Sequence, residues 1–327
     1  MRPALHLLSA LCLGISAAAT AHMSATQSSF VAMLGTYQGN GCDGVKRMGN
    51  FSSWLGRRPD FVLDFIASDS WQSMQGDANW ASKCWSHQPV EVVFSVPMLM
   101  NDHGTLAEGA SGKFDDQFRQ LAETLIKNGF AHSVIRLGWE FNGGWYPWAA
   151  KKDPDNWVKY WRRIVTTMRS VPGAAFLFDW CVAQGYQQIP APQVYPGDEY
   201  VDVIGYDLYN QIWLKQQPTA EQRWQQLLAQ AYGLNWLNDF ATRHAKPISI
   251  PEWATGTRPD GHGGDDDDYF VSNMVEWIRQ HNVAYHAYWD YKAKDYDGKL
   301  SDGRRPKSAT AFLKAFRSFP PSAERTP

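Results

Sequence analysis

The sequence alternates short apolar runs with longer runs whose apolar residues recur at helical spacing, and this pattern restricts the fold more than any other feature. The strand-like runs are Phe30–Thr36, Phe61–Ala67, Val90–Met98, Ser133–Glu140, Ala174–Cys181, Tyr200–Tyr209, Pro247–Glu252 and Val283–Asp290. Helical spacing recurs at residues 44–55, 114–126, 155–168, 224–231, 269–278 and 309–319. Strands that alternate with helices predict a parallel sheet. Eight such units in 327 residues predict an α/β fold of the (β/α)₈, or TIM-barrel, type.

A doubly wound open sheet is the alternative arrangement of the same elements. Nucleotide-binding sheets of that type carry a glycine-rich turn with GxGxxG spacing after the first strand. The corresponding segment here, GTYQGNGCDG at Gly35–Gly44, has the glycines without the spacing. The barrel is therefore favoured.

Composition argues against some partners and raises a question about the aromatic residues. The formal net charge is −2, whereas a nucleic-acid-binding surface needs a basic stripe. The chain has 16 Trp, more than a core of this size usually needs. Some of these tryptophans pack the core, or they form exposed platforms that stack on a flat ligand. Composition alone leaves both readings open.

The N-terminus resembles a secretory signal peptide. Arg2 precedes the apolar run Ala4–Ala18, and Ala19–Ala21 matches a small-residue cleavage site. We therefore expect residues 1–21 to be removed, residues 22–327 to form a single catalytic domain, and the protein to be secreted or periplasmic. The apolar run is too short to span a membrane, and no other segment is a candidate, so we expect neither a membrane nor a nucleic-acid partner.

Cysteines and acidic runs give little sign of a metal site. In an exported protein Cys42 and Cys84 are able to pair and leave Cys181 buried and free, although the spacing does not establish this. The sequence has no HExxH motif and no Cys/His cluster at zinc spacing, so we expect no metal and no cofactor. The run Asp265–Asp268 fits a calcium loop or, better, the N-terminus of a helix, where negative charge is favourable.

Acidic residues recur at the predicted strand ends, where the active sites of such barrels lie. They are Glu140, Asp179, Asp207, Glu252 and Asp290. Two glutamates at one barrel mouth suit glycoside hydrolysis, which needs one carboxyl to protonate the leaving oxygen and one to act at the anomeric carbon. The aromatic surroundings of Glu140 favour its protonated form. The other interpretation of each glutamate is a salt-bridge partner or a helix cap.

Three segments give the chain a resemblance to glycoside hydrolase family 26, whose members include β-mannanases, β-glucanases and β-xylanases of a retaining (β/α)₈ clan. RLGWEFNGGWYPW, from Arg136, resembles the family's acid/base segment and implies that Glu140 is the acid/base. KPISIPEWAT, from Lys246, implies that Glu252 is the nucleophile. In YPGDEYVDVIGYDLYN the resemblance implies that Tyr209, or alternatively Tyr206, hydrogen-bonds that nucleophile.

The resemblance and the local sequence also suggest substrate-binding residues. AYWDYK matches the position where a tryptophan commonly lies beneath the sugar at the cleavage point, here Trp289. Trp145 is a candidate sugar platform or a loop brace, and Asn142 a candidate hydroxyl donor or a turn residue. Arg136 shares strand parity with Glu140, so both should point into the barrel. We expect Arg136 to act on Glu252 without touching substrate, or to be a paired core arginine.

One residue departs from the family pattern. The mannanases usually have His immediately before the acid/base residue, whereas this chain has Trp139, which offers one donor and a flat face. Trp139 is therefore a candidate determinant of which sugar is bound, and the departure makes mannan a less secure substrate.

The sequence thus predicts a monomeric, retaining, endo-acting glycoside hydrolase that cleaves a β-linked polysaccharide such as mannan, β-glucan, xylan or an exopolysaccharide. Two alternatives stay open. One is a carbohydrate-binding barrel without catalysis, and the other is a hydrolase that trims an exopolysaccharide during its secretion. The loop Asn101–Lys113 is expected to be a flexible wall of the cleft.

Overall fold

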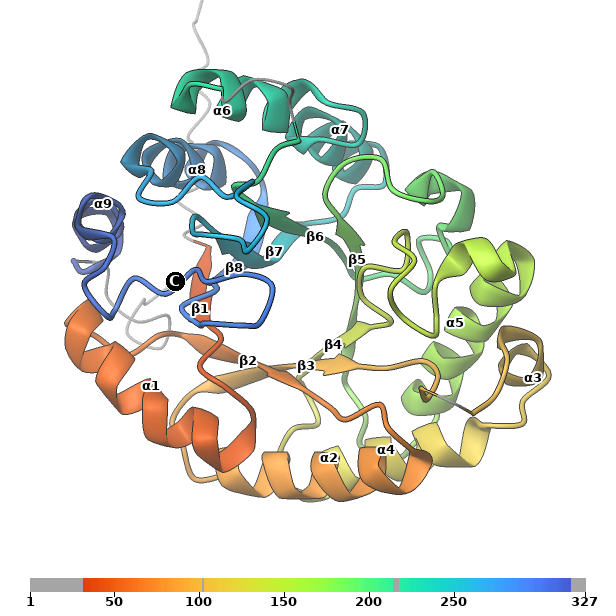
Figure 1. Cartoon of the computed structure of the whole chain (residues 1–327). Coiled ribbons are helices and arrows are strands. Elements are labelled where there is room, and N and C mark those ends of the chain that lie inside the picture. The colour runs from red at the N-terminus through yellow and green to blue at the C-terminus, as the bar shows by residue number, and fades with distance from the viewer. Residues whose placement is uncertain (1–31, 102, 214–217, 319–327) are drawn as a thin grey trace, which may run out of the picture. The chain divides into compact units, whose positions relative to one another are not determined.

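A computed structural model describes residues 32–101, 103–213 and 218–318. Within them the strands form a closed parallel barrel in the order β1 to β8, as predicted (Figure 1). The strands are β1 (Met33–Thr36), β2 (Phe61–Phe65), β3 (Glu91–Val96), β4 (Val134–Leu137), β5 (Leu177–Ala183), β6 (Val203–Tyr209), β7 (Ile248–Ala254) and β8 (Val283–Tyr288). The predicted signal peptide, residues 1–21, lies outside the described residues and stays a prediction.

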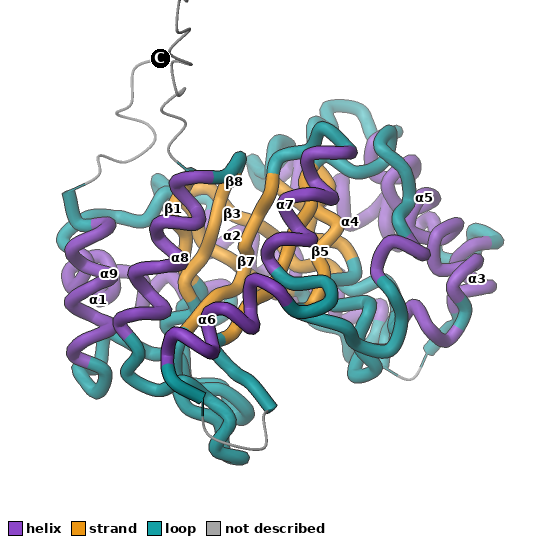
Figure 2. Tube along the Cα trace, turned by 90° about the horizontal axis from the view of Figure 1, so that it is seen from above, coloured by secondary structure: helices purple, strands orange, loops and turns teal. Residues whose placement is uncertain are grey.

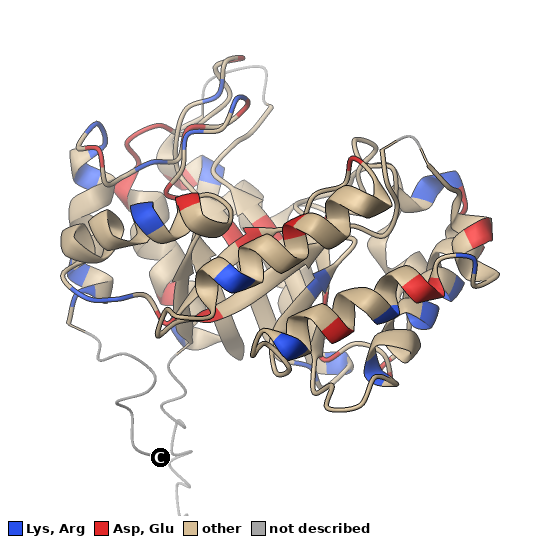
Figure 3. Ribbon diagram, turned by 90° about the horizontal axis from the view of Figure 1, so that it is seen from below, with Lys and Arg blue, Asp and Glu red and all other residues tan. Residues whose placement is uncertain are grey.

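Helices surround the barrel (Figures 1 and 2). They are α1 (Gly41–Leu55), α2 (Trp71–Trp85), α3 (Leu106–Ala110), α4 (Asp115–Lys127), α5 (Pro154–Arg169), α6 (Ala220–Ala229), α7 (Leu234–Arg243), α8 (Asp268–Gln280) and α9 (Pro306–Phe316). None of the described helices is long and apolar enough to cross a bilayer. Acidic and basic residues are intermixed along the helix ribbons in the view of Figure 3, with no single basic stripe among the residues drawn in colour.

Three helices were not predicted from the sequence. In α2 small and polar residues dilute the apolar pattern, since its buried positions include Ala78, Ala81 and Ser82. Its start is instead fixed by a capping box between Ser70 and Ser73. Helix α7 was missed as well, and α3 lies in the loop that was expected to be a flexible cleft wall. That expectation was wrong for residues 106–110, because α3 packs against α5.

The barrel interior changes from apolar to polar along the strands. A small apolar cluster fills the barrel with side chains from β2, β3, β6 and β8; its buried members are Phe61, Leu63, Val93, Val203, Tyr285 and Ala287. Asp179, two residues beyond the start of β5, is fully buried and accepts hydrogen bonds from Ser249 (2.7 Å) and Tyr285. Burial raises the pKa of Asp179 to about 6, and these hydrogen bonds oppose the rise. The ionisable side chain of Asp179 thus lies in the barrel interior together with the apolar cluster.

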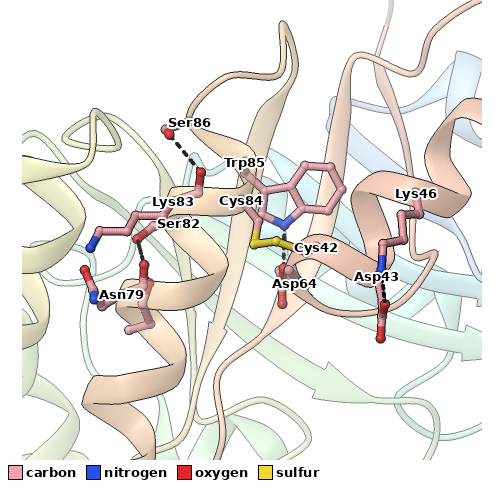
Figure 4. Close-up of a disulfide and its surroundings, with 12 residues drawn as sticks. Cys42, Asp43, Lys46, Asp64, Asn79, Ser82, Lys83, Cys84, Trp85 and Ser86 are labelled. Carbon is pink, nitrogen blue, oxygen red and sulfur yellow. Dashed lines mark hydrogen bonds and ion pairs between the residues drawn. A yellow bond between two sulfur atoms is a disulfide. The ribbon is translucent and has the colours of Figure 1, made fainter.

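A disulfide joins the first two helices. Cys42 at the start of α1 is bonded to Cys84 near the end of α2, with 5.0 Å between the Cα atoms (Figure 4). Beside it, Asp64 of β2 accepts hydrogen bonds from the Gly41 amide (2.7 Å) and the Trp85 indole (2.5 Å). Cys181 is buried and free. The disulfide between Cys42 and Cys84, which the sequence did not establish, is therefore present in the structure. It holds the segment after β1 against the segment after β2.

The acidic run before α8 caps helices. The side chain of Asp267 accepts a hydrogen bond from the Phe270 amide (3.0 Å) at the start of α8. Asp266 accepts from the amides of Lys307 (3.2 Å) and Ser308 (2.8 Å) at the start of α9. This arrangement confirms the interpretation of the run as a helix N-terminus.

Candidate active site

Glu140 lies just beyond the end of β4 in a turn that forces an unusual backbone conformation. The strand ends at Leu137, and both Gly138 (φ 57°) and Glu140 (φ 52°) are in the left-handed region. Such a φ is uncommon for a residue with a side chain and marks a conformation that the surroundings impose. The Glu140 amide is held by the Cys181 carbonyl of β5 (2.9 Å). Glu140 therefore reaches the barrel mouth from a turn, not from the predicted strand register.

The surroundings of Glu140 favour its protonated form. Desolvation raises the pKa of Glu140 to about 7, and the negative charge of Glu252 adds to the rise. Arg136 and a 2.8 Å hydrogen bond from the Trp145 indole to Glu140 Oε2 oppose it. A carboxyl with such a pKa is able both to donate and to accept a proton near neutral pH.

Glu252 lies within β7 and is held on both oxygens. The Tyr209 hydroxyl donates to Oε2 at 2.5 Å, and Arg136 Nη2 is 2.8 Å from Oε1. Only 7% of the residue is exposed. A hydrogen-bond donor and a cation thus contact the two oxygens of one carboxylate, and both contacts are charge-assisted. Tyr209, not Tyr206, makes this contact, because the Tyr206 hydroxyl faces the helical layer and donates to the Tyr232 carbonyl.

Arg136 forms the floor beneath the two glutamates. It is fully buried and pairs with Asp207 as well as Glu252, while Nη1 donates to Ser95 Oγ at 3.0 Å. Burial raises the pKa of Asp207, and the Arg136 guanidinium opposes the rise. Arg136 is not among the residues that line the cavity. Its predicted electrostatic role fits this position, whereas a direct contact with substrate does not.

Both glutamates open into one cavity of about 900 Å³. Its walls come from segments at and after the C-terminal ends of the strands, and the side chains include Phe65, Glu140, Trp145, Tyr146, Gln184, Tyr186, Gln187, Asp207, Tyr209, Trp213, Glu252, Arg258, Trp289 and Asp295. The cavity is at the upper end of the volume range of small-molecule sites, so it has room for more than one sugar ring.

Two of the predicted platform residues lie in this wall. Trp145 is 53% exposed, and its ring lies over Gly143, where an added Cβ would be 2.3 Å from the ring. Trp289 is half-buried and stacks on Tyr37 with 4.4 Å between ring centroids. Their positions suit sugar stacking, although sugar binding itself stays a prediction.

The other two predicted contacts do not reach the cavity wall. Asn142 is 1% exposed, and its amide exchanges two 2.9 Å hydrogen bonds with the backbone of Ala183, so it fixes the end of β5. Trp139 is 4% exposed; its ring packs over Arg136, and its indole donates to the Tyr146 hydroxyl at 2.9 Å. The structure gives no support to direct sugar contacts by either residue, because their polar atoms are used inside the protein.

Sequence reasoning also missed several residues of the wall. Asp207 was noted as a strand-end acid but given no role, although it lies two residues before Tyr209 and hence on the same face of β6. Tyr146 lies in the acid/base segment, but its position depends on a turn that no periodicity describes. Gln184 and Asp295 lie in loops, and no motif or periodicity in the sequence marks them as residues of the cavity wall.

Comparisons with known proteins agree with this geometry. The sequence model of glycosyl hydrolase family 26 matches residues 80–239, which include Glu140 and Tyr209. Endoglucanase H of Acetivibrio thermocellus is 25% identical over 294 residues, which are 81% of this chain and 28% of that protein. The chain thus spans about a quarter of the length of this relative.

Solved structures share the fold at low sequence identity. A family 26 β-mannanase from Bacteroides ovatus superposes with a TM-score of 0.60 at 17% identity, covering 88% of this chain and 89% of that one. An endo-β-1,4-mannanase from Cellulomonas fimi gives a TM-score of 0.61 at 16% identity, covering 86% and 71%. The chain is therefore similar to glycosyl hydrolase family 26 over residues 80–239, and it shares the barrel fold of solved members of that family.

Proposed function

We propose that this protein is a retaining, endo-acting glycoside hydrolase that cleaves a β-linked polysaccharide. The observation that carries the proposal is the unequal environment of two glutamates in one cavity. Glu140 has a pKa raised to about 7, whereas Glu252 is held by the Tyr209 hydroxyl and the Arg136 guanidinium. Two carboxyls in unlike surroundings are what acid-assisted displacement at an anomeric carbon requires.

The reaction proceeds in two displacements. In the first, a Glu252 oxygen bonds to the anomeric carbon while the glycosidic bond breaks and Glu140 gives its proton to the leaving oxygen. In the second, Glu140 takes a proton from water, the water oxygen bonds to the anomeric carbon, and the ester to Glu252 breaks. Two inversions give net retention. Tyr209 releases the Glu252 oxygen as the ester forms and holds it again when the carboxylate leaves.

The charges of the cavity favour a neutral polysaccharide over a polyuronate. Glu140, Asp207, Glu252 and Asp295 contribute carboxyls to the wall. The cation in the wall, Arg258, is paired with Asp260 at 3.0 Å. A uronate carboxylate would therefore enter a site with an excess of like charge. The mannanase and endoglucanase names of similar proteins make β-mannan and β-glucan the first substrates to test.

We further propose that the protein acts after export, in the periplasm or outside the cell. The signal-like residues 1–21 suggest it, and a disulfide such as Cys42–Cys84 forms and persists in oxidising compartments. Cell fractionation with N-terminal sequencing of the mature chain tests this. An exported chain that begins near His22 supports the proposal, and an intact cytosolic chain refutes it.

A polysaccharide panel tests the activity itself. We expect new reducing ends from β-1,4-mannan, mixed-linkage β-glucan or xylan, a rapid fall in viscosity that marks endo cleavage, and a first-formed product with the β-anomeric proton in NMR spectra. Little or no cleavage of a polyuronate is expected. Binding of a polysaccharide without new reducing ends would favour the non-catalytic barrel instead, and a first-formed α-anomer would refute retention.

A further inference from the structure

Tyr146 is a fixed part of the cavity wall. Its ring stacks on the fully buried Trp148 with 4.5 Å between centroids and 8° between planes. The Trp148 indole in turn donates to the Trp139 carbonyl at 2.9 Å. The ring of Tyr146 is thus held from behind, while its other surroundings include the cavity that contains Glu140 and Glu252.

The hydrogen bond from Trp139 decides the direction of the Tyr146 hydroxyl. An indole N–H is a donor only, so at 2.9 Å the Tyr146 oxygen must be the acceptor. The hydroxyl proton is then free to make a second bond, and no acceptor for it is recorded among the described residues. A phenol in this position is able to donate to an occupant of the cavity, because the bond from Trp139 leaves its own O–H unused.

The charges around Tyr146 keep that proton in place. Burial raises the pKa of Tyr146 well above its usual value, and the charges of Glu140 and then Glu252 raise it further. The phenol therefore stays protonated over the pH range in which Glu140 titrates. Tyr146, Glu140 and Glu252 line the same cavity, so the ring of Tyr146 borders the space in which a sugar would react.

We propose that the Tyr146 hydroxyl donates a hydrogen bond to an oxygen of the sugar ring bound between Glu140 and Glu252, and that Trp139 is the positioning residue that orients it. The substrate class is a neutral pyranoside with a hydroxyl or ring-substituent oxygen at that point. This rests on the proposed function for the identity of the ligand, but binding alone is sufficient to test it. It also gives Trp139 an indirect part in sugar selection, in place of the direct contact that the sequence suggested.

A competing explanation gives Tyr146 a structural part only, as the acceptor that satisfies the buried Trp139 indole. Both explanations expect Tyr146→Phe to lower the melting temperature, because the Trp139 N–H loses its partner. Only our proposal expects sugar affinity to fall as well. Tyr195→Phe is the matched control, because it removes a hydroxyl that bonds Asp198 at 2.9 Å outside the cavity.

The experiment measures binding of mannohexaose, cellohexaose and xylohexaose by calorimetry to the Glu252→Gln variant, with and without Tyr146→Phe, and kcat/KM in the otherwise native chain. We expect about a 10-fold loss in both for Tyr146→Phe, the size of one hydrogen bond to ligand, and no loss for Tyr195→Phe. Trp139→Phe should weaken binding less than Tyr146→Phe does. In a chain that already carries Tyr146→Phe, the further substitution Trp139→Phe should cause almost no additional loss of affinity.

The outcomes separate the two proposals. Unchanged affinity with a lower melting temperature, independent effects of Trp139→Phe and Tyr146→Phe, or no binding of any of the three hexaoses would overturn this inference. A wild-type chain that binds a hexaose, loses affinity on Tyr146→Phe and releases no reducing ends would overturn the proposed hydrolase and leave this inference standing.

Discussion

Glu140 and Glu252 face the same cavity but are held by different kinds of structure. Glu252 is part of β7, with one oxygen on Tyr209 and the other on Arg136. Glu140 lies past the end of β4 at φ 52°, and the side-chain donor on it is the half-exposed Trp145. The first carboxyl is fixed by a donor and a cation, whereas the second is desolvated and has its pKa raised to about 7. The fold thus divides two chemical roles between identical side chains.

The largest expected effect is at the fixed carboxylate. Glu252→Gln removes the proposed nucleophile and leaves the amide next to Tyr209 and Arg136. We expect kcat to fall by about 10⁴-fold to 10⁶-fold, the range seen when a nucleophile is deleted. Reducing-end assays on the best substrate of the panel check it. Loss of less than about 10-fold would contradict the assignment.

At the desolvated carboxyl the effect should depend on the leaving group. Glu140→Gln is expected to lower kcat/KM on polysaccharide by about 10²-fold to 10⁴-fold, because proton transfer to the leaving oxygen is lost. An aryl glycoside whose phenol leaves without protonation should lose much less activity in its glycosylation step. Equal losses on both substrates would mean that Glu140 is not the acid.

A smaller effect is expected at the Tyr209 hydroxyl. Tyr209→Phe deletes the donor on Glu252, and a hydrogen bond to a charged group contributes about 1.5–3 kcal/mol, so kcat/KM should fall by about 10-fold to 100-fold. Tyr206→Phe is the control, since its hydroxyl bonds the Tyr232 carbonyl behind β6. The control should be less stable but nearly as active, and a similar loss in both variants would refute the specific role of Tyr209.

The smallest expected effect concerns the raised pKa of Glu140. As pH rises through about 7, Glu140 loses the proton it must donate, so kcat/KM should fall along a basic limb centred there. The Trp145 hydrogen bond lowers this pKa, so Trp145→Phe should raise it and move the limb to higher pH by about half a unit to one unit. A pH profile of kcat/KM checks it, and a limb that moves to lower pH would contradict the stated cause.

The strands could be predicted from the sequence because they depend on runs of apolar residues. The positions of side chains that follow a turn could not be predicted in this way. All eight strands and the barrel follow from apolar runs, and Tyr209 keeps the alternation of β6. The register of β7 shifts between Ile250 and Trp253, so regular alternation does not by itself place Glu252 at the cavity. Beyond Leu137 the backbone leaves that register, so the parity argument that placed Glu140 with Arg136 does not hold there. The same turn sends Trp139 and Asn142 into the protein.

Other misses have equally local causes. Helix α2 was missed because small residues separate Met74 from Trp85 on its buried face, and its capping box carries the signal instead. The pairing of Cys42 with Cys84 depends on two helix positions brought together by β1 and β2, which spacing cannot give. Loop residues such as Tyr146 and Asp295 enter the cavity only once the barrel is closed.

The most direct test of the division between Glu140 and Glu252 is the site of a trapped covalent intermediate. A 2-deoxy-2-fluoro glycoside with a good leaving group, built on the sugar that the panel identifies, should form a stable ester with the nucleophile. Mass spectrometry of the digested protein is then expected to find the fluoro-sugar on the peptide that contains Glu252, and no label in the Glu252→Gln variant. Label on Glu140, or complete hydrolysis with no trapped ester at any residue, would contradict the account.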